Sequence, residues 1–176
     1  MLLERTPDTT STPATPSLGV LSTLSCAQLT QLVGRELGVG APVAVTQEQI
    51  DAFAGCTGDR QWMHIDVERS RRESPYGGTV AHGFLLLALL ARLLDELAGV
   101  PEDAAGVINT GLNNVRFRAP VRAGSRVRVR ARLAGVAPLG DGRNLVTTSV
   151  ALEVADDAGA TDAVAVTADL FVLVFR

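Results

Sequence analysis

The chain has 176 residues and a net charge of −3, which allows one domain but is short for two. Nearly half of its residues are apolar, and its 16 cationic side chains are outnumbered by 19 anionic ones, which disfavours nucleic acid as a partner. Cys26 and Cys56 fit no disulfide or metal pattern, and neither a signal peptide nor an apolar run of the roughly 20 residues that span a membrane is present. We therefore expect a single-domain cytoplasmic protein that binds neither nucleic acid nor membrane.

The first third of the chain predicts short elements behind a tail. Residues 5–17 are rich in Pro and Thr, so we expect a flexible tail over residues 1–20 and a domain over residues 21–176. The elements expected next are a short helix over 25–32, a glycine loop over 34–40, a strand over 43–45, and a helix with a Thr46–Gln49 capping box that Gly55 ends.

The middle of the chain predicts an irregular segment and then the longest helix. Residues 56–79 show no sustained periodicity, and we expect at most one short helix there, over residues 67–72. Leucines three and four residues apart predict a helix over residues 83–98. Because its first half is apolar nearly all round, this helix should be central and buried.

The last seventy residues predict strands separated by short turns. The expected strands cover residues 107–117, 125–136, 144–154 and 163–175. Four consecutive strands predict an antiparallel meander that curls over the buried helix. The fold class expected is α+β.

Two neighbouring features can carry chemistry. Asp59 and His64 lie five residues apart beside Gly58 in a segment expected to be a loop, where a carboxylate could take a proton from water while an imidazole positions it. The spacing alone also fits a helix cap and a solvated ring. Gly83 opens the buried helix, and its N–H could hold a polarised carbonyl oxygen, although a glycine can equally serve tight helix packing.

Together these features resemble the MaoC-like (R)-specific enoyl-CoA hydratases, which have the hot-dog fold. The shared pattern is Gly-Asp-x-x-x-x-His-x-Asp over residues 58–66, followed by His82-Gly83 at the head of a long apolar helix. The likeness extends over roughly residues 24–176, including Gly34 to Gly38, Thr46-Gln47, and Asn114 to Phe117.

The resemblance implies a reaction and a role for each residue. Asp59 would accept a proton from a water also held by His64, and this water would attack C3 of an enoyl thioester carried by CoA or an acyl carrier protein. His64, or the water together with His64, would deliver a proton to C2, and the Gly83 N–H would stabilise the thioester oxygen as it gains charge. No cofactor and no metal is implied.

The sequence departs from the family pattern at two places. Many relatives have Asn-Pro where this chain has Gln61-Trp62, and some carry a serine on the central helix that supports the catalytic carboxylate. The helix here has no hydroxyl, and Ala88 and Ala91 stand where one would be expected. This departure keeps open a non-catalytic subunit or acyl-binding role.

Three further residues are candidates for substrate binding. Trp62 could line an acyl pocket and Tyr76 a tunnel, although packing is the simpler interpretation of both. Arg116 could contact phosphates of the carrier, as could part of a row of arginines at period two, Arg126, Arg128, Arg130 and Arg132, whose simpler interpretation is a solvated strand face. His82 is expected to be structural.

The fold alone leaves a second activity and the assembly open. A hot-dog thioesterase would share the scaffold but release the thiol, whereas the Gly-Asp-x4-His order with His-Gly downstream favours hydration. A single curled sheet leaves an exposed edge that a second copy could extend, so we expect a homodimer.

Overall fold

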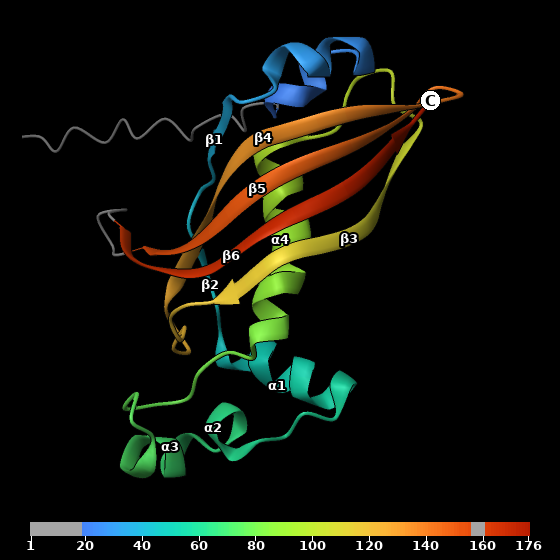
Figure 1. Ribbon diagram of the computed structural model, residues 1–176. Coiled ribbons are helices and arrows are strands. Elements are labelled where there is room, and N and C mark those ends of the chain that lie inside the picture. The colour runs from blue at the N-terminus through green and yellow to red at the C-terminus, as the bar shows by residue number, and fades with distance from the viewer. Residues whose placement is uncertain (1–18, 156–160) are drawn as a thin grey trace, which may run out of the picture.

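The computed structural model describes residues 19–155 and 161–176, in which one antiparallel sheet curls around a long helix, α4 (Gly83–Ala98) (Figure 1). The strand order is β1-β4-β5-β6-β3, with β2 also paired to β4. The strands are β1 (Glu36–Val39), β2 (Val43–Ala44), β3 (Gly106–Phe117), β4 (Arg126–Gly140), β5 (Arg143–Ala155) and β6 (Thr161–Phe175). The predicted α+β class, with a sheet curled over a buried helix, is confirmed.

Shorter helices lie at the two ends of α4. The 3-10 helices η1 (Val20–Thr23) and η2 (Cys26–Leu32) lie near its C-terminal end, and α1 (Gln47–Thr57), α2 (Trp62–Ile65) and α3 (Val67–Glu73) lie beyond its N-terminal end, outside the curl of the sheet (Figure 1). None of the helices in the described part of the chain is long and apolar enough to span a membrane. The expected flexible tail falls almost wholly on residues 1–18, outside the described residues.

The core lies between α4 and the inner face of the sheet. Leu86, Leu90 and Leu93 are at most 3% exposed, and they face strand residues that alternate with polar ones. On β4 the buried set is Val127, Val129, Ala131 and Leu133. Full burial of a leucine contributes roughly 2 kcal/mol, so this repeated contact explains why one face of α4 packs on the sheet. The opposite face, with Phe84, Ala88 and Ala91, is exposed, with Phe84 at 70%.

Three sequence predictions about the elements are wrong. The strands do not form a simple meander, because β3 pairs with β6 and lies at the edge far from β4. The glycine loop predicted over residues 34–40 contains β1, since β4 is long enough to supply hydrogen bonds to it. Helix α1 does not end at Gly55 but runs to Thr57, and Gly58, with φ 81°, forms its left-handed C-cap.

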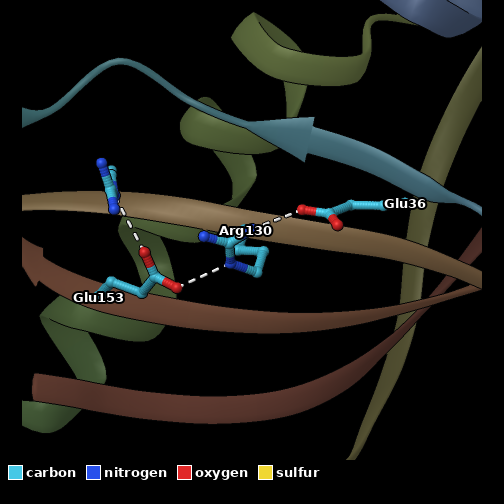
Figure 2. Close-up of polar contacts among 4 residues, drawn as sticks. Glu36, Arg130 and Glu153 are labelled. Atoms are coloured by element: carbon cyan, nitrogen blue, oxygen red, sulfur yellow. Dashed lines mark hydrogen bonds and ion pairs between the residues drawn. The ribbon is translucent and has the colours of Figure 1, made fainter. Parts of the chain in front are cut away.

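The predicted row of arginines lies on the outer face of β4, where its members make contacts within the protein. Figure 2 shows Glu153 of β5 bonded to Arg130, which also binds Glu36 of β1; the distances are 2.8 and 2.6 Å. Glu153 also accepts from Arg128 at 2.9 Å, and its side chain is only 7% exposed. Hydrogen bonds from Arg130 to Glu153, and then to Glu36, raise the pKa of Arg130 above its ordinary value. These contacts tie β1, β4 and β5 together, so the row is more than a solvated strand face.

Candidate active site

Asp59 follows directly on the end of α1. The left-handed Gly58 turns the chain away from the helix axis, and the exposed Asp59 comes next. Its backbone carbonyl accepts a hydrogen bond from Nε2 of His82 at 2.9 Å, and its N–H donates to Oγ1 of Thr57 at 3.3 Å. The backbone of Asp59 is therefore held at both its N–H and its carbonyl group, while the residue remains exposed.

His64 does not lie in a loop, as predicted, but on the single turn of α2. Its side chain is buried, and its Nδ1 lies 2.7 Å from the carbonyl oxygen of Val80. Since a carbonyl can only accept, Nδ1 must carry the hydrogen. In the neutral ring this leaves Nε2 with the lone pair, the form that a general base requires.

His82 connects the two candidate residues. Its ring stacks on that of His64, with centroids 3.9 Å apart and an interplanar angle of 29°, and Phe53 packs on it at 5.1 Å. His82 is 2% exposed and donates from Nε2 to Asp59, whereas its Nδ1 has no hydrogen-bond partner within the described residues. The side chain thus braces both neighbours, in keeping with the structural role expected for it.

The three side chains form one cluster. One oxygen of Asp59 and one ring nitrogen each of His64 and His82 all lie within 4.8 Å of one another. Two groups that share one water at a tetrahedral angle lie about 4.6 Å apart, so this limit is compatible with a water between Asp59 and His64. A metal ion fits less well, because imidazole lone pairs lie in the ring plane, and the planes of two rings stacked 3.9 Å apart at 29° do not meet at the roughly 2 Å that a metal–nitrogen bond requires.

Gly83 begins α4 immediately after His82. Its N–H belongs to the first turn, where helix geometry supplies no intrahelical acceptor. A Cβ added at this position would lie 2.8 Å from Cε1 of Phe117, so any larger residue would have to displace this ring, and a glycine here allows close packing against β3. The structure therefore supports the packing role of Gly83 and leaves its N–H available at the helix end.

Two apolar cavities lie along α4 on the side of β3. The one nearer the cluster, of about 260 Å³, is lined in part by Leu87, Ala88 and Ala91. The other, of about 300 Å³, lies toward the C-terminal end of α4, and both share Ala91, Asn109 and Leu170 as lining residues. The two alanines found in place of a helix hydroxyl thus face an apolar groove that begins one turn beyond Gly83.

The three predicted substrate-binding residues do not line this groove. Trp62 is half-buried, and the Arg69 guanidinium lies 4.4 Å from the centre of its ring. Tyr76 is 41% exposed after α3. Arg116 borders a shallow hollow on the sheet with Arg118 and Asp169. Of the sequence candidates, the structure brings together Asp59, His64 and the start of α4, but none of these three.

Two residues that position the site were missed by the sequence analysis. Val80 supplies the carbonyl that selects the tautomer of His64, and Phe117 packs on Gly83. A backbone carbonyl leaves no trace in residue type, so nothing in the sequence singles out Val80. Phe117 was noted only as part of the family pattern, and its contact with Gly83 joins residues 34 positions apart.

Comparison with known proteins gives a consistent family. Residues 28–155 match the model of the MaoC-like domain. The 3-hydroxyacyl-thioester dehydratase Z of Mycobacterium tuberculosis is 46% identical over 130 residues, which cover 74% of this chain and 85% of that protein. Nodulation protein N of Rhizobium leguminosarum bv. viciae is 41% identical over 137 residues, covering 76% and 83%.

A solved structure agrees with these relatives. The MaoC-like dehydratase from Rhodospirillum rubrum superposes with a TM-score of 0.62 at 28% identity, covering 82% of this chain and 92% of that one. The curled sheet, the buried helix and the Asp59–His64 cluster at its start are thus found in a chain that belongs to the MaoC-like dehydratase family.

Proposed function

We propose that this protein adds water to trans-2-enoyl thioesters to give (R)-3-hydroxyacyl thioesters, or catalyses the reverse dehydration. The observation that carries the proposal is the cluster of Asp59 and His64, in which Nδ1–H is fixed on Val80 and the second ring nitrogen is left as a base. Relatives named as dehydratases of 3-hydroxyacyl thioesters and of 3-hydroxybutyryl-CoA support the reaction class. The (R) configuration follows from the family resemblance.

Each residue of the cluster has a task in this reaction. Asp59 takes one proton from the water that it shares with His64, and the hydroxyl forms a bond to C3 as the C2=C3 π electrons move toward the thioester. The Gly83 N–H stabilises the oxygen of that thioester as it gains charge. The proton taken by Asp59 then passes through the lone pair on Nε2 of His64 to C2, which completes the addition of one water and regenerates both residues; no redox step is required.

The apolar groove along α4 is the proposed binding site for the acyl chain of the substrate. We infer that the acyl chain enters between α4 and β3, where Ala88 and Ala91 leave room, with its thioester at the Gly83 end. Trp62, Tyr76 and Arg116 remain candidates for contact with the CoA or acyl carrier protein part, because each lies outside the groove.

The free cysteines, Cys26 buried and Cys56 exposed, are compatible with the reducing cytoplasm in which we place the reaction.

A spectrophotometric assay tests the proposal. Crotonyl-CoA and longer enoyl-CoAs are expected to lose their enoyl absorbance with the wild-type protein, and Asp59→Asn or His64→Gln to lower kcat by roughly 10² to 10⁴-fold each. Thiol release without loss of the enoyl group would instead indicate a thioesterase. Full activity in both variants would contradict the site, and an inactive wild type would contradict the reaction.

We also propose that the protein is a homodimer joined along β3. This strand pairs with β6 on one side, and four of its apolar residues are 44–53% exposed: Val107, Ile108, Leu112 and Phe117. An edge strand with this composition is suited to pair with a second copy. Light scattering should give twice the chain mass for the wild type and the single mass for Ile108→Arg, whereas Leu139→Arg, a matched change at a 50% exposed site on β4, should stay dimeric.

A further inference from the structure

Gln47, the first residue of α1, connects the helix that carries His64 to the segment before α4. Its Nε2 donates to the carbonyl oxygen of His64 and to the Asp51 carboxylate, both at 2.8 Å, and its Oε1 accepts from Oγ1 of Thr79 at 2.6 Å. Rotating the amide by 180° would set its oxygen against two acceptors, so the partners determine its orientation. All the polar atoms of this amide are thus engaged.

The Thr79 end of this connection is anchored to the body of the protein. Val80 forms a β-bridge with Arg122, the Ala81 N–H donates to Val121 at 2.8 Å, and the Ala123 N–H donates to Thr79 at 3.0 Å. Thr79 itself is only 4% exposed. The fold therefore fixes the position of the Thr79 hydroxyl that donates to Gln47.

The His64 end is held by a small set of contacts. Helix α2 has four residues, and a single turn is not stable without contacts from outside. Besides Gln47, two hydrogen bonds join it to residue 80: the Val80 N–H donates to Met63 at 3.0 Å, and the His64 ring donates to the Val80 carbonyl at 2.7 Å. Two side chains link α2 to residues 79–81 through hydrogen bonds among the described residues. One is the His64 imidazole, and the other is Gln47.

We propose that Gln47 is a positioning residue for His64. By holding the backbone of His64 at a set distance from Thr79 and Val80, it keeps Nδ1–H on the Val80 carbonyl and directs Nε2 toward the water shared with Asp59. The kinetic consequence rests on the proposed hydratase function, but the effect on the tautomer does not. A displacement of a catalytic group by about 1 Å costs on the order of 100-fold in rate.

Four variants separate this role from general support of α1. Gln47→Ala removes the link, and Gln47→Glu keeps the acceptor for Thr79 but places an oxygen against the His64 carbonyl. Thr79→Val removes the other end of the link at nearly constant volume. Gln49→Ala is the matched control, because Gln49 caps the same helix through the Thr46 N–H at 3.0 Å and makes no contact with α2 among the described hydrogen bonds.

The first readout is kinetic. Gln47→Ala, Gln47→Glu and Thr79→Val are expected to lower kcat on an enoyl-CoA by about 10 to 100-fold with KM within about twofold of the wild type, since the base moves while the acyl groove does not. Gln49→Ala is expected to keep kcat within about twofold. Equal losses in Gln47→Ala and Gln49→Ala would overturn the proposal.

The second readout is spectroscopic and independent of activity. The chain has only two histidines, so the imidazole ¹⁵N spectrum holds two rings, which His64→Gln assigns. The wild type should show His64 as the Nδ1–H tautomer, and the link variants a mixture with the Nε2–H form, while His82 serves as the internal reference. If Gln47→Ala does not fold, Thr79→Val carries both measurements.

The outcomes distinguish the two proposals. A changed tautomer in a protein inactive on enoyl thioesters would support the role of Gln47 and contradict the proposed function. An unchanged tautomer together with wild-type kcat in Thr79→Val would contradict the role of Gln47, whatever the reaction proves to be.

Discussion

The sheet around α4 and the cluster at its N-terminal end are held together by different forces. In the sheet region, residues such as Leu90 and Leu152 are fully buried, and their stabilisation depends on apolar area rather than on direction. At the cluster, His64 and His82 are held by single hydrogen bonds to carbonyl groups and by stacking. The first region should therefore tolerate small shifts that the second cannot, because hydrogen bonds weaken steeply with angle and distance.

The largest expected effect on stability lies in the helix core. Leu90→Ala removes a side chain that is 0% exposed and should lower the free energy of unfolding by about 3 kcal/mol, through lost burial and the cavity left behind. Urea unfolding measures the change, with Leu139→Ala, at a 50% exposed position, as the control that should stay within about 0.5 kcal/mol. Similar losses in both would contradict the core assigned here.

The boundary between the two regions can be tested at Gly83. Gly83→Ala places a Cβ against the Phe117 ring and should lower the free energy of unfolding by about 1 to 2 kcal/mol. The double variant that combines Gly83→Ala with Phe117→Leu should recover most of this loss. Gly55→Ala is the matched control, since nothing lies within 4 Å of the added Cβ inside α1, and it should stabilise by about 0.5 kcal/mol or more. A stable Gly83→Ala single variant would contradict the Phe117 contact.

A smaller effect depends on pH and concerns the outer face of the sheet. Hydrogen bonds from Ser149 at 2.5 Å and from Asn114 at 2.7 Å lower the pKa of Asp169 below its ordinary value of 3.8. A depressed pKa in the folded state means that this stabilisation is complete above the ordinary value and disappears as the pH falls below it. Asp169→Asn should therefore cost roughly 1 kcal/mol at pH 7 and progressively less in acid; a difference that persists unchanged at low pH would refute the assignment.

The smallest effect is expected at the exposed end of the ion pairs in Figure 2. Glu36 is 53% exposed where it meets Arg130, so Glu36→Gln should cost no more than about 0.5 kcal/mol, and the cost should fall at high salt. Thermal unfolding at low and high salt measures this. A loss above 2 kcal/mol would show that β1 depends on this contact far more than its exposure implies.

Elements with a local pattern can be identified from the residues alone. Leucines at helical spacing identify α4 from Gly83 to Ala98, and alternation identifies the long strands, although the predicted end of β4 at residue 136 falls four residues short of Gly140. The Asp59–His64 spacing, with the family pattern around it, was sufficient to pick out the cluster. Periodicity carries this information because the geometry of a helix or strand fixes the face on which each of its side chains lies.

Features that depend on partners distant in the chain become visible only in the folded protein. The pairing of β3 with β6, the strand β1 in place of a loop, and the Nδ1–H tautomer of His64 each require a group from another element. Alternation tells which face of a strand is buried but not which strand lies beside it. A carbonyl such as that of Val80 has the same chemistry at every residue, so only its position in space gives it a role.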